Sequence, residues 1–176
     1  MTIEEIINYL LGERRDIKGS DLLKEMLKND KFRILIEKGI LTGMIKPLLT
    51  DEFIQRMELQ NCRGYSSLLN IFVDGKNIGT CNATSTELSY MLPDIDLVGG
   101  INPFFIGTPA SPDGIHSWLE DERQLYDTST LMIVDKSYIK ALDYNENKRF
   151  TKYDLLMNKY YQSAREFACD RSLRSK

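Results

Sequence analysis

Helical and strand-like patterns occupy different parts of this 176-residue chain. Over the first sixty residues, apolar side chains recur at the three- and four-residue spacing of amphipathic helices. Thr2 and Glu5 form a possible capping box for the first helix. Ser20 and Thr50 are placed to cap two later helices. Strand-like segments follow at residues 68–73, 98–107, 114–120 and 124–129, the last of which can continue through Val134. Because helices and strands are segregated, we expect an α+β fold.

Three further helices are predicted among and after the strands. Apolar residues at helical spacing run from Cys81 to Leu92, a weaker helix covers residues 136–142, and Thr151 is placed to cap a longer C-terminal helix. We therefore expect a helical N-terminal part over residues 1–60 and a core with C-terminal helices over residues 61–176.

Charge and composition exclude several classes of protein. Lys and Arg total 23 against 26 Asp and Glu, and a net charge of −3 argues against a general nucleic-acid or anionic-membrane binder. No apolar run approaches the roughly 20 residues that span a membrane. The acidic N-terminus lacks the basic start of a signal peptide, so we expect a cytoplasmic protein.

The cysteines and the single histidine suit catalysis better than a structural role. The cysteines are Cys62, Cys81 and Cys169, an odd number that does not suggest a disulfide framework. There is no CxxC pair, and His116 is the only histidine, which argues against a structural zinc site. Nucleophilic catalysis needs one residue of each kind.

Cys81 stands where a helical pattern begins, directly after Gly79 and Thr80. A cysteine there faces the positive end of the helix dipole and unpaired backbone N–H groups. Both favour the thiolate, which is the nucleophile, and the same N–H groups can receive an oxyanion. A lone cysteine in this position is also explained by packing, because free cysteine behaves as a small hydrophobe.

His116 and Asp127 lie on the two arms of a predicted β-hairpin. A two-residue loop at 121–122, or a four-residue loop at 120–123, pairs Leu119 with Gln124 and places His116 directly opposite Asp127. A carboxylate at that separation can hold one imidazole nitrogen and fix its tautomer. Alternation puts Trp118 on the same face, where its indole can shield the pair from water. A surface hairpin with a half-buried histidine is the competing interpretation.

Three segments together resemble the transglutaminase-like, papain-related family: 79–85 (GTCNATS), 114–120 (GIHSWLE) and 126–129 (YDTS). That family places a cysteine at a helix start, a histidine within an H-x-W-x-E strand and an aspartate on the next strand. The resemblance covers roughly residues 65 to 134. The members of this family include bacterial peptidases. It implies a papain/transglutaminase-like core, in which a nucleophile helix packs on a small antiparallel sheet.

The resemblance implies thiol-dependent acyl transfer on a peptide or amide carbonyl, as in a cysteine peptidase, deamidase or transglutaminase. Cys81, His116 and Asp127 are the expected catalytic triad, and Asn77 and Trp118 are weaker candidates for oxyanion or substrate contacts. No metal or organic cofactor is implied, and the expected partner is a protein or peptide substrate, with no nucleic acid or membrane.

Two alternatives remain open from the sequence. One is a catalytically inactive domain of the same fold that binds proteins, and the other is chemistry like that of arylamine N-acetyltransferases, which share the Cys, His, Asp order. The short chain and the lack of an acyl-CoA patch weigh against the second.

Overall fold

The computed structural model describes residues 1–12, 21–59, 81–92, 94–108, 111–151 and 154. Its α-helices are α1 (Ile3–Leu10), α2 (Asp21–Met26), α3 (Asp30–Leu41), α4 (Asp51–Leu59) and α6 (Cys81–Met91), and two 3-10 helices are η1 (Pro103–Phe105) and η2 (Lys136–Leu142). Its strands are β1 (Ile45–Pro47), β2 (Asp96–Ile101), β3 (Ile115–Glu120), β4 (Gln124–Asp127), β5 (Met132–Asp135) and β6 (Asn145–Phe150). The molecule is therefore α+β, as the segregated pattern predicts.

Three of the expected helix caps are present, and at Thr151 the hydroxyl accepts a hydrogen bond from Asp154 N. At the start of α1, the Thr2 side chain accepts a hydrogen bond from Glu5 N, and the Glu5 carboxylate accepts one from Thr2 N, which completes the capping box. At the start of α4, Thr50 Oγ1 accepts a hydrogen bond from Phe53 N. The expected cap Ser20 and the expected strand at 68–73 lie outside the described residues.

All the strand pairs in the sheet are antiparallel, in the order β1-β5-β4-β3-β2-β6. The two edge strands are absent from the sequence-based prediction, and β5, which is expected as a continuation of the strand at 124–129, is a separate strand paired with β4. β1 has three residues, one of them proline, and β6 is mostly exposed polar residues, so neither has the apolar alternation that marks a strand. Pairing with β5 and β2 defines them instead, and β1 adds a strand to a region where only helices are expected.

The predicted strand ends are also too long. The segment 98–107 leaves the sheet at Ile101 and turns into η1, and β4 ends at Asp127 rather than Ser129. Asn102 accounts for the first change, because its side chain accepts a hydrogen bond from Phe104 N and so caps η1, which Pro103 begins.

The β3–β4 hairpin has a different register from the one expected. Leu119 pairs with Tyr126 and Glu120 with Leu125, so Trp118 rather than His116 falls opposite Asp127. The turn lies further along the chain because the Asp121 carboxylate accepts hydrogen bonds from Arg123 N and Gln124 N. The register differs from the expected one by two residues, and an even shift keeps His116 and Asp127 on the same face of the sheet.

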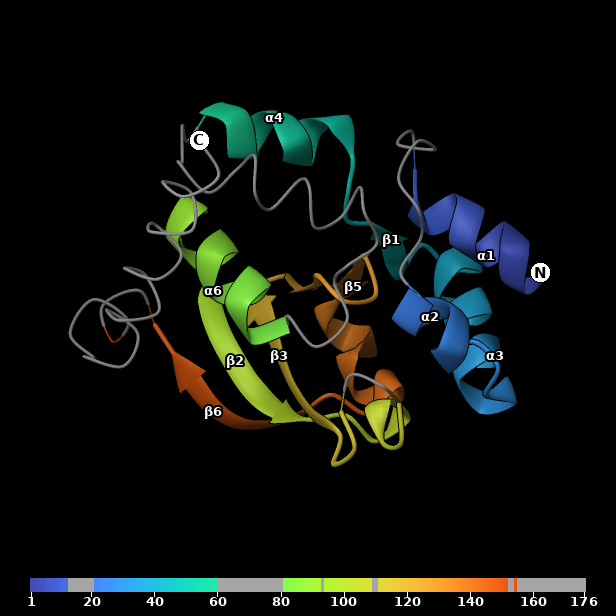
Figure 1. Ribbon diagram of the computed structural model, residues 1–176. Helices are drawn as coiled ribbons and strands as arrows, with labels where there is room; N and C mark the ends of the chain where they lie inside the picture. The colour runs from blue at the N-terminus through green and yellow to red at the C-terminus, as the bar shows by residue number, and fades with distance from the viewer. Residues whose placement is uncertain (13–20, 60–80, 93, 109–110, 152–153, 155–176) are drawn as a thin grey trace, which may run out of the picture.

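Apolar side chains bury both faces of the sheet. On one face, residues of α4 and α6 such as Phe53 and Leu88 form a core with Leu97 and Leu119. On the other, α1, α2 and α3 form a core with Val98, Trp118, Leu125, Val134 and neighbouring residues. Figure 1 shows α6 lying over β2 and β3, and α1 to α3 gathered beside the β1 end of the sheet. Strand β3 is thus covered on both sides.

The division into parts 1–60 and 61–176 stays a prediction. Among the described residues, the helices are all too short or too polar to cross a lipid bilayer.

Candidate active site

Cys81 is the first residue of α6, and two hydrogen bonds hold the start of this helix against the sheet. Ser85 Oγ donates to Ser117 O on β3 at 3.3 Å, and the hydroxyls of Thr84 and Thr128 lie 2.7 Å apart. The free thiol of Cys81 is half-buried. The helix start is therefore fixed beside His116, the residue before Ser117.

His116 lies on β3 with its imidazole enclosed by aromatic rings. The centroid of the Phe105 ring is 4.0 Å from that of the imidazole in a stacked arrangement, and the Trp118 ring is 6.0 Å away. His116 Nε2 lies 2.8 Å from Asp127 Oδ2. Both side chains are almost wholly removed from solvent, with exposed fractions of 1% and 0%. Since Asp127 holds Nε2, the ring nitrogen left to face Cys81 is Nδ1.

Asp127 accepts a hydrogen bond from each of four groups. Oδ2 receives the Tyr144 hydroxyl at 2.5 Å as well as His116. Oδ1 receives Ser129 N at 2.8 Å and Thr130 N at 3.3 Å. The backbone donors come from the turn between β4 and β5, where Leu131 has a φ of +57°. Both carboxylate oxygens are thus occupied, which fixes the orientation of the group and stabilises its charge.

The three groups shift one another's pKa values. Burial would raise the pKa of the Cys81 thiol, but its hydrogen bond to His116, the His116 charge and the Ser117 N–H hold that pKa below its usual value. Burial would lower the pKa of His116, but the Asp127 charge, the Asp127 hydrogen bond and Cys81 raise it to about 9.

The pKa of the Asp127 carboxyl lies below its usual value, because His116, Tyr144 and Ser129 N outweigh the effect of burial. The arrangement therefore favours the thiolate form of Cys81 and the imidazolium form of His116, with the imidazolium facing a carboxylate.

His116 and Asp127 lie within hydrogen-bonding distance as expected, even though the predicted hairpin register is wrong, and Cys81 lies close enough to His116 for each to shift the other's pKa. Their roles as a catalytic triad stay a prediction. Trp118 lies beside His116 as expected, fully buried, and its N–H donates to Glu120 Oε1 at 2.8 Å. That N–H is thus not directed at the thiol, and a substrate contact by Trp118 stays a prediction.

Asn77, the weaker oxyanion candidate, lies outside the described residues, as do Cys62 and Cys169. Within the described part of the chain, no three His, Cys, Asp or Glu side chains converge as a metal site.

Two residues at this site are missed by the sequence analysis. Tyr144 follows η2 and donates to Asp127, and Phe105 ends η1 and stacks on His116. Tyr144 stands between Asp143 and Asn145, in no periodic pattern that distinguishes it from the other tyrosines. Phe105 falls in a segment expected to be strand. The pairing of β2 with β3 and with β6 brings both residues to His116.

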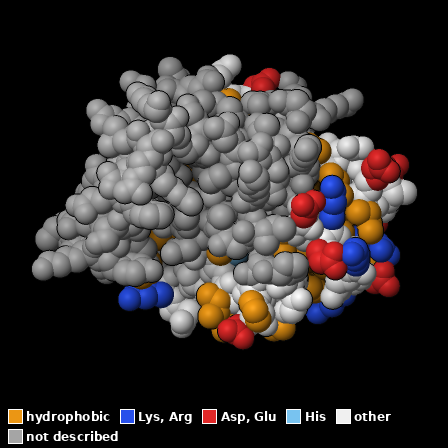
Figure 2. All heavy atoms as spheres, viewed as in Figure 1, with side chains coloured by type: hydrophobic (Ala, Val, Ile, Leu, Met, Phe, Trp, Pro, Cys, Tyr) orange, Lys and Arg blue, Asp and Glu red, His pale blue; other side chains and the backbone are white. Residues whose placement is uncertain are grey.

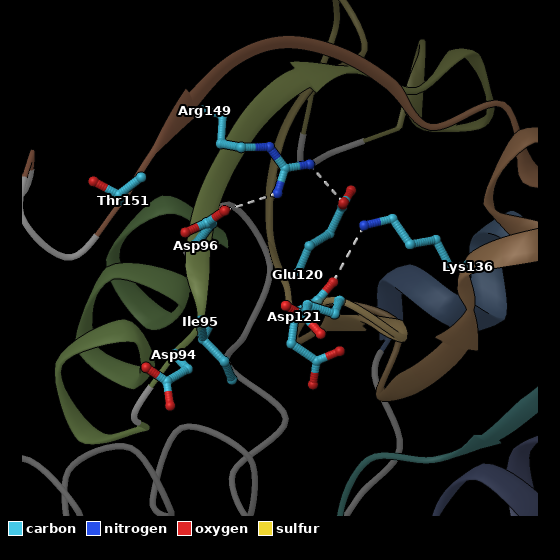
Figure 3. A pocket seen from close by; sticks show the side chains of 9 residues that line it. Asp94, Ile95, Asp96, Glu120, Asp121, Lys136, Arg149 and Thr151 are labelled. Carbon is cyan, nitrogen blue, oxygen red and sulfur yellow. Dashed lines mark hydrogen bonds and ion pairs between the residues drawn. The ribbon is translucent and has the colours of Figure 1, made fainter.

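A separate cavity of about 430 Å³ lies at the other end of β3. Its lining is rich in acidic side chains and includes Asp94, Ile95, Asp96, Glu120, Asp121, Glu122, Lys136, Arg149 and Thr151. Figure 3 shows the Arg149 guanidinium between Asp96 and Glu120, and the N···O distances of these ion pairs are 3.1 and 2.6 Å. Since Glu120 also accepts from Trp118, Arg149 neutralises a buried carboxylate that anchors the indole beside His116.

Apolar side chains are exposed near the candidate triad. Ile101 and Ile115 are paired across β2 and β3, and Ile106 follows η1. Figure 2 shows apolar side chains on this part of the surface. Ile115 immediately precedes His116, so this apolar surface adjoins the segment that carries the imidazole.

Comparison with protein-family models, curated proteins and solved structures finds no match to this chain.

Proposed function

We propose that this chain catalyses thiol-dependent acyl transfer on a peptide or amide carbonyl, with Cys81 as nucleophile, His116 as general acid and base, and Asp127 as the orienting carboxylate. The observation that carries the proposal is the buried His116–Asp127 hydrogen bond, on a carboxylate that accepts four hydrogen bonds, next to a Cys81 thiol at the start of α6 whose pKa responds to His116. The sequence resemblance to the transglutaminase-like family supports the same chemistry.

The first half-reaction forms a thioester. The Cys81 thiolate attacks the carbonyl carbon, and the carbonyl oxygen takes the negative charge beside the N–H groups at the start of α6. The His116 imidazolium then gives its Nδ1 proton to the leaving amine as the carbon–nitrogen bond breaks. Asp127 stabilises the imidazolium throughout and does not itself take the proton.

The second half-reaction releases the acyl group. His116, now neutral, takes a proton from water or from an acceptor amine, which attacks the thioester carbon and expels the Cys81 thiolate. Water as the acceptor makes the chain a peptidase or deamidase, and an amine makes it a transferase. The antiparallel sheet carrying α6 over β3 is consistent with a papain/transglutaminase-like core. The cytoplasm is the proposed compartment, since the odd cysteine count does not suggest a disulfide framework.

The proposal is tested with two probes that need no known substrate. Iodoacetamide should alkylate Cys81 with a rate that is half-maximal well below the roughly pH 8.5 of an ordinary thiol. p-Nitrophenyl acetate should acetylate Cys81, with a burst of nitrophenolate and a peptide mass that locates the acetyl group. Cys81→Ala should lose both reactions, and Cys62→Ala should keep them.

Two results would count against this function. An ordinary thiol titration without acetylation of Cys81 would favour a catalytically inactive domain that binds proteins. Loss of the burst in Cys62→Ala, with the burst kept in Cys81→Ala, would assign the nucleophile to the other cysteine.

A further inference from the structure

Tyr144 makes its hydrogen bond to the candidate triad through its hydroxyl. Its hydroxyl donates to Asp127 Oδ2, the same oxygen that His116 Nε2 engages. The side chain is buried, and its ring packs edge-on against Trp118 at 5.2 Å and lies 6.2 Å from His116. The carboxylate is already held in place through Oδ1 by Ser129 N and Thr130 N. The hydroxyl is therefore not needed simply to locate Asp127.

We propose that Tyr144 is a positioning residue that shares the charge of Asp127 Oδ2 with His116 and so weakens the hold of the carboxylate on the imidazole proton. This inference rests on the proposed function, because it concerns how readily His116 returns a proton during acyl transfer.

The direction of the effect follows from the charge of the His116–Asp127 couple. With His116 protonated the couple is neutral overall, and with His116 deprotonated it carries one negative charge, all of it on the carboxylate. A hydrogen-bond donor stabilises the charged form more than the neutral one. The Tyr144 hydroxyl therefore lowers the proton affinity of the couple, and its removal raises that affinity.

The surroundings keep Tyr144 in its donor form. Burial and the Asp127 charge raise the pKa of the Tyr144 phenol well above its usual value, so the hydroxyl stays protonated. The groups that act on the imidazole electrostatically are Asp127 from β4 and Cys81 from α6. Tyr144 acts on it through Asp127, and the more distant Glu120 is neutralised by Arg149. Removal of the Tyr144 hydroxyl thus changes a small, defined set of interactions.

The consequence for catalysis concerns the general-acid step. With a pKa already raised to about 9, His116 holds its proton firmly at neutral pH. A further rise in the His116 pKa would slow transfer of that proton to the leaving amine, because a general acid is most efficient when its pKa lies near the working pH. Tyr144 limits the rise in the His116 pKa, while the Asp127 carboxylate still orients the imidazole ring.

The test uses the fact that His116 is the only histidine in the chain. Its imidazole signals can be titrated by NMR in the full-length protein without assignment. In Tyr144→Phe, which keeps the ring and removes the hydroxyl, the midpoint of the His116 titration should move upward by about half a pH unit or more. Tyr138→Phe is the matched control, since it removes a hydroxyl that donates to Leu35 O on α3. The midpoint of the His116 titration in Tyr138→Phe should equal that of the unmodified protein.

A second measurement covers the case in which Tyr144→Phe does not fold. Biosynthetic replacement of tyrosine by 3-fluorotyrosine leaves the sequence intact and makes each phenol a stronger donor, so the His116 midpoint should move downward. An unchanged or lowered midpoint in folded Tyr144→Phe, or an unchanged or raised midpoint with fluorotyrosine, overturns the inference. These readouts do not depend on turnover. Absence of Cys81 acetylation together with the expected midpoint shifts would refute the acyl-transfer function and leave the role of Tyr144 standing.

Discussion

At the scale of single residues, Asp127 is the group on which the candidate site depends. It is fully buried, and a buried carboxylate stays ionised only when it is paired and hydrogen-bonded. The two oxygens of Asp127 meet that condition through His116, Tyr144 and two backbone N–H groups. All four donors remain in place when His116 is neutral, because the proton that it gives up is on Nδ1 and Nε2–H still donates to Asp127. The carboxylate therefore stays oriented toward the ring throughout the reaction.

Asp127→Asn should reduce the turnover number far more than it changes apparent substrate affinity. The amide keeps the shape of the side chain but has no negative charge to stabilise the imidazolium. Its N–H group can also face His116 Nε2, which favours the wrong tautomer of the imidazole. We expect a loss on the order of 10²–10³ in kcat, smaller than the roughly 10⁴ seen for the matching change in a serine-protease triad. Steady-state kinetics on an acyl substrate give the measurement. Unchanged kcat with a raised KM would make Asp127 a structural or substrate-contact residue.

At the scale of elements, the close approach of β2, β3 and β6 positions the aromatic rings around His116. Gly100 lies where the pairing of β2 with β6 shifts register, and it is paired with His116 on β3. A Cβ atom at Gly100 would lie 2.1 Å from Asn145 O and 2.7 Å from the Trp118 ring. The strands can pack this closely because residue 100 has no side chain.

Gly100→Ala should therefore lower the free energy of unfolding by about 1–3 kcal/mol, the usual cost of overpacking a filled interior. The neighbouring Gly99 is the matched control, because a Cβ there meets no atom within 4 Å. Gly99→Ala should change stability little. Urea unfolding followed by fluorescence of Trp118, the only tryptophan, measures both variants. Equal stability of the two alanine variants would contradict the close packing described for Gly100.

At the scale of the whole molecule, the buried His116–Asp127 pair links folding to pH. An unfolded histidine titrates near pH 6.5, whereas the pKa of folded His116 is about 9. The folded state thus binds this proton more tightly. The stabilisation from His116 is fully present below about pH 6.5 and is lost as the pH rises through about 9. Asp127 affects stability at acid pH. Because its pKa is lowered in the folded state, its stabilisation is present above the pKa of an unfolded aspartate and is lost as the pH falls from there through the folded pKa.

The fall in stability at high pH is best measured in Cys81→Ala, because the thiol is a second titratable group in contact with His116 and would add its own contribution to the curve. In that variant the free energy of unfolding should fall as the pH rises above about 6.5. In the double variant Cys81→Ala/Asp127→Asn, the charge that raises the His116 pKa is gone, so the fall should be smaller. Urea unfolding at a series of pH values gives both curves. Parallel curves for the two variants would show that Asp127 does not couple His116 to folding.

The sequence by itself determined the fold class, several helix caps and the proximity of Cys81, His116 and Asp127. Capping depends on residues three apart in the chain, and the face on which His116 and Asp127 lie depends only on the parity of the hairpin register, so a two-residue error left the contact intact.

Tertiary structure alone decided the rest. Strands β1 and β6 exist because β5 and β2 supply their hydrogen-bond partners, since their own sequences carry no apolar alternation. Phe105 and Tyr144 reach the site from segments 11 residues before and 28 residues after His116, through the pairing of β2 with β3 and β6. Contacts between distant segments depend on which strands pair and in what register, and local patterns along the chain do not encode that choice.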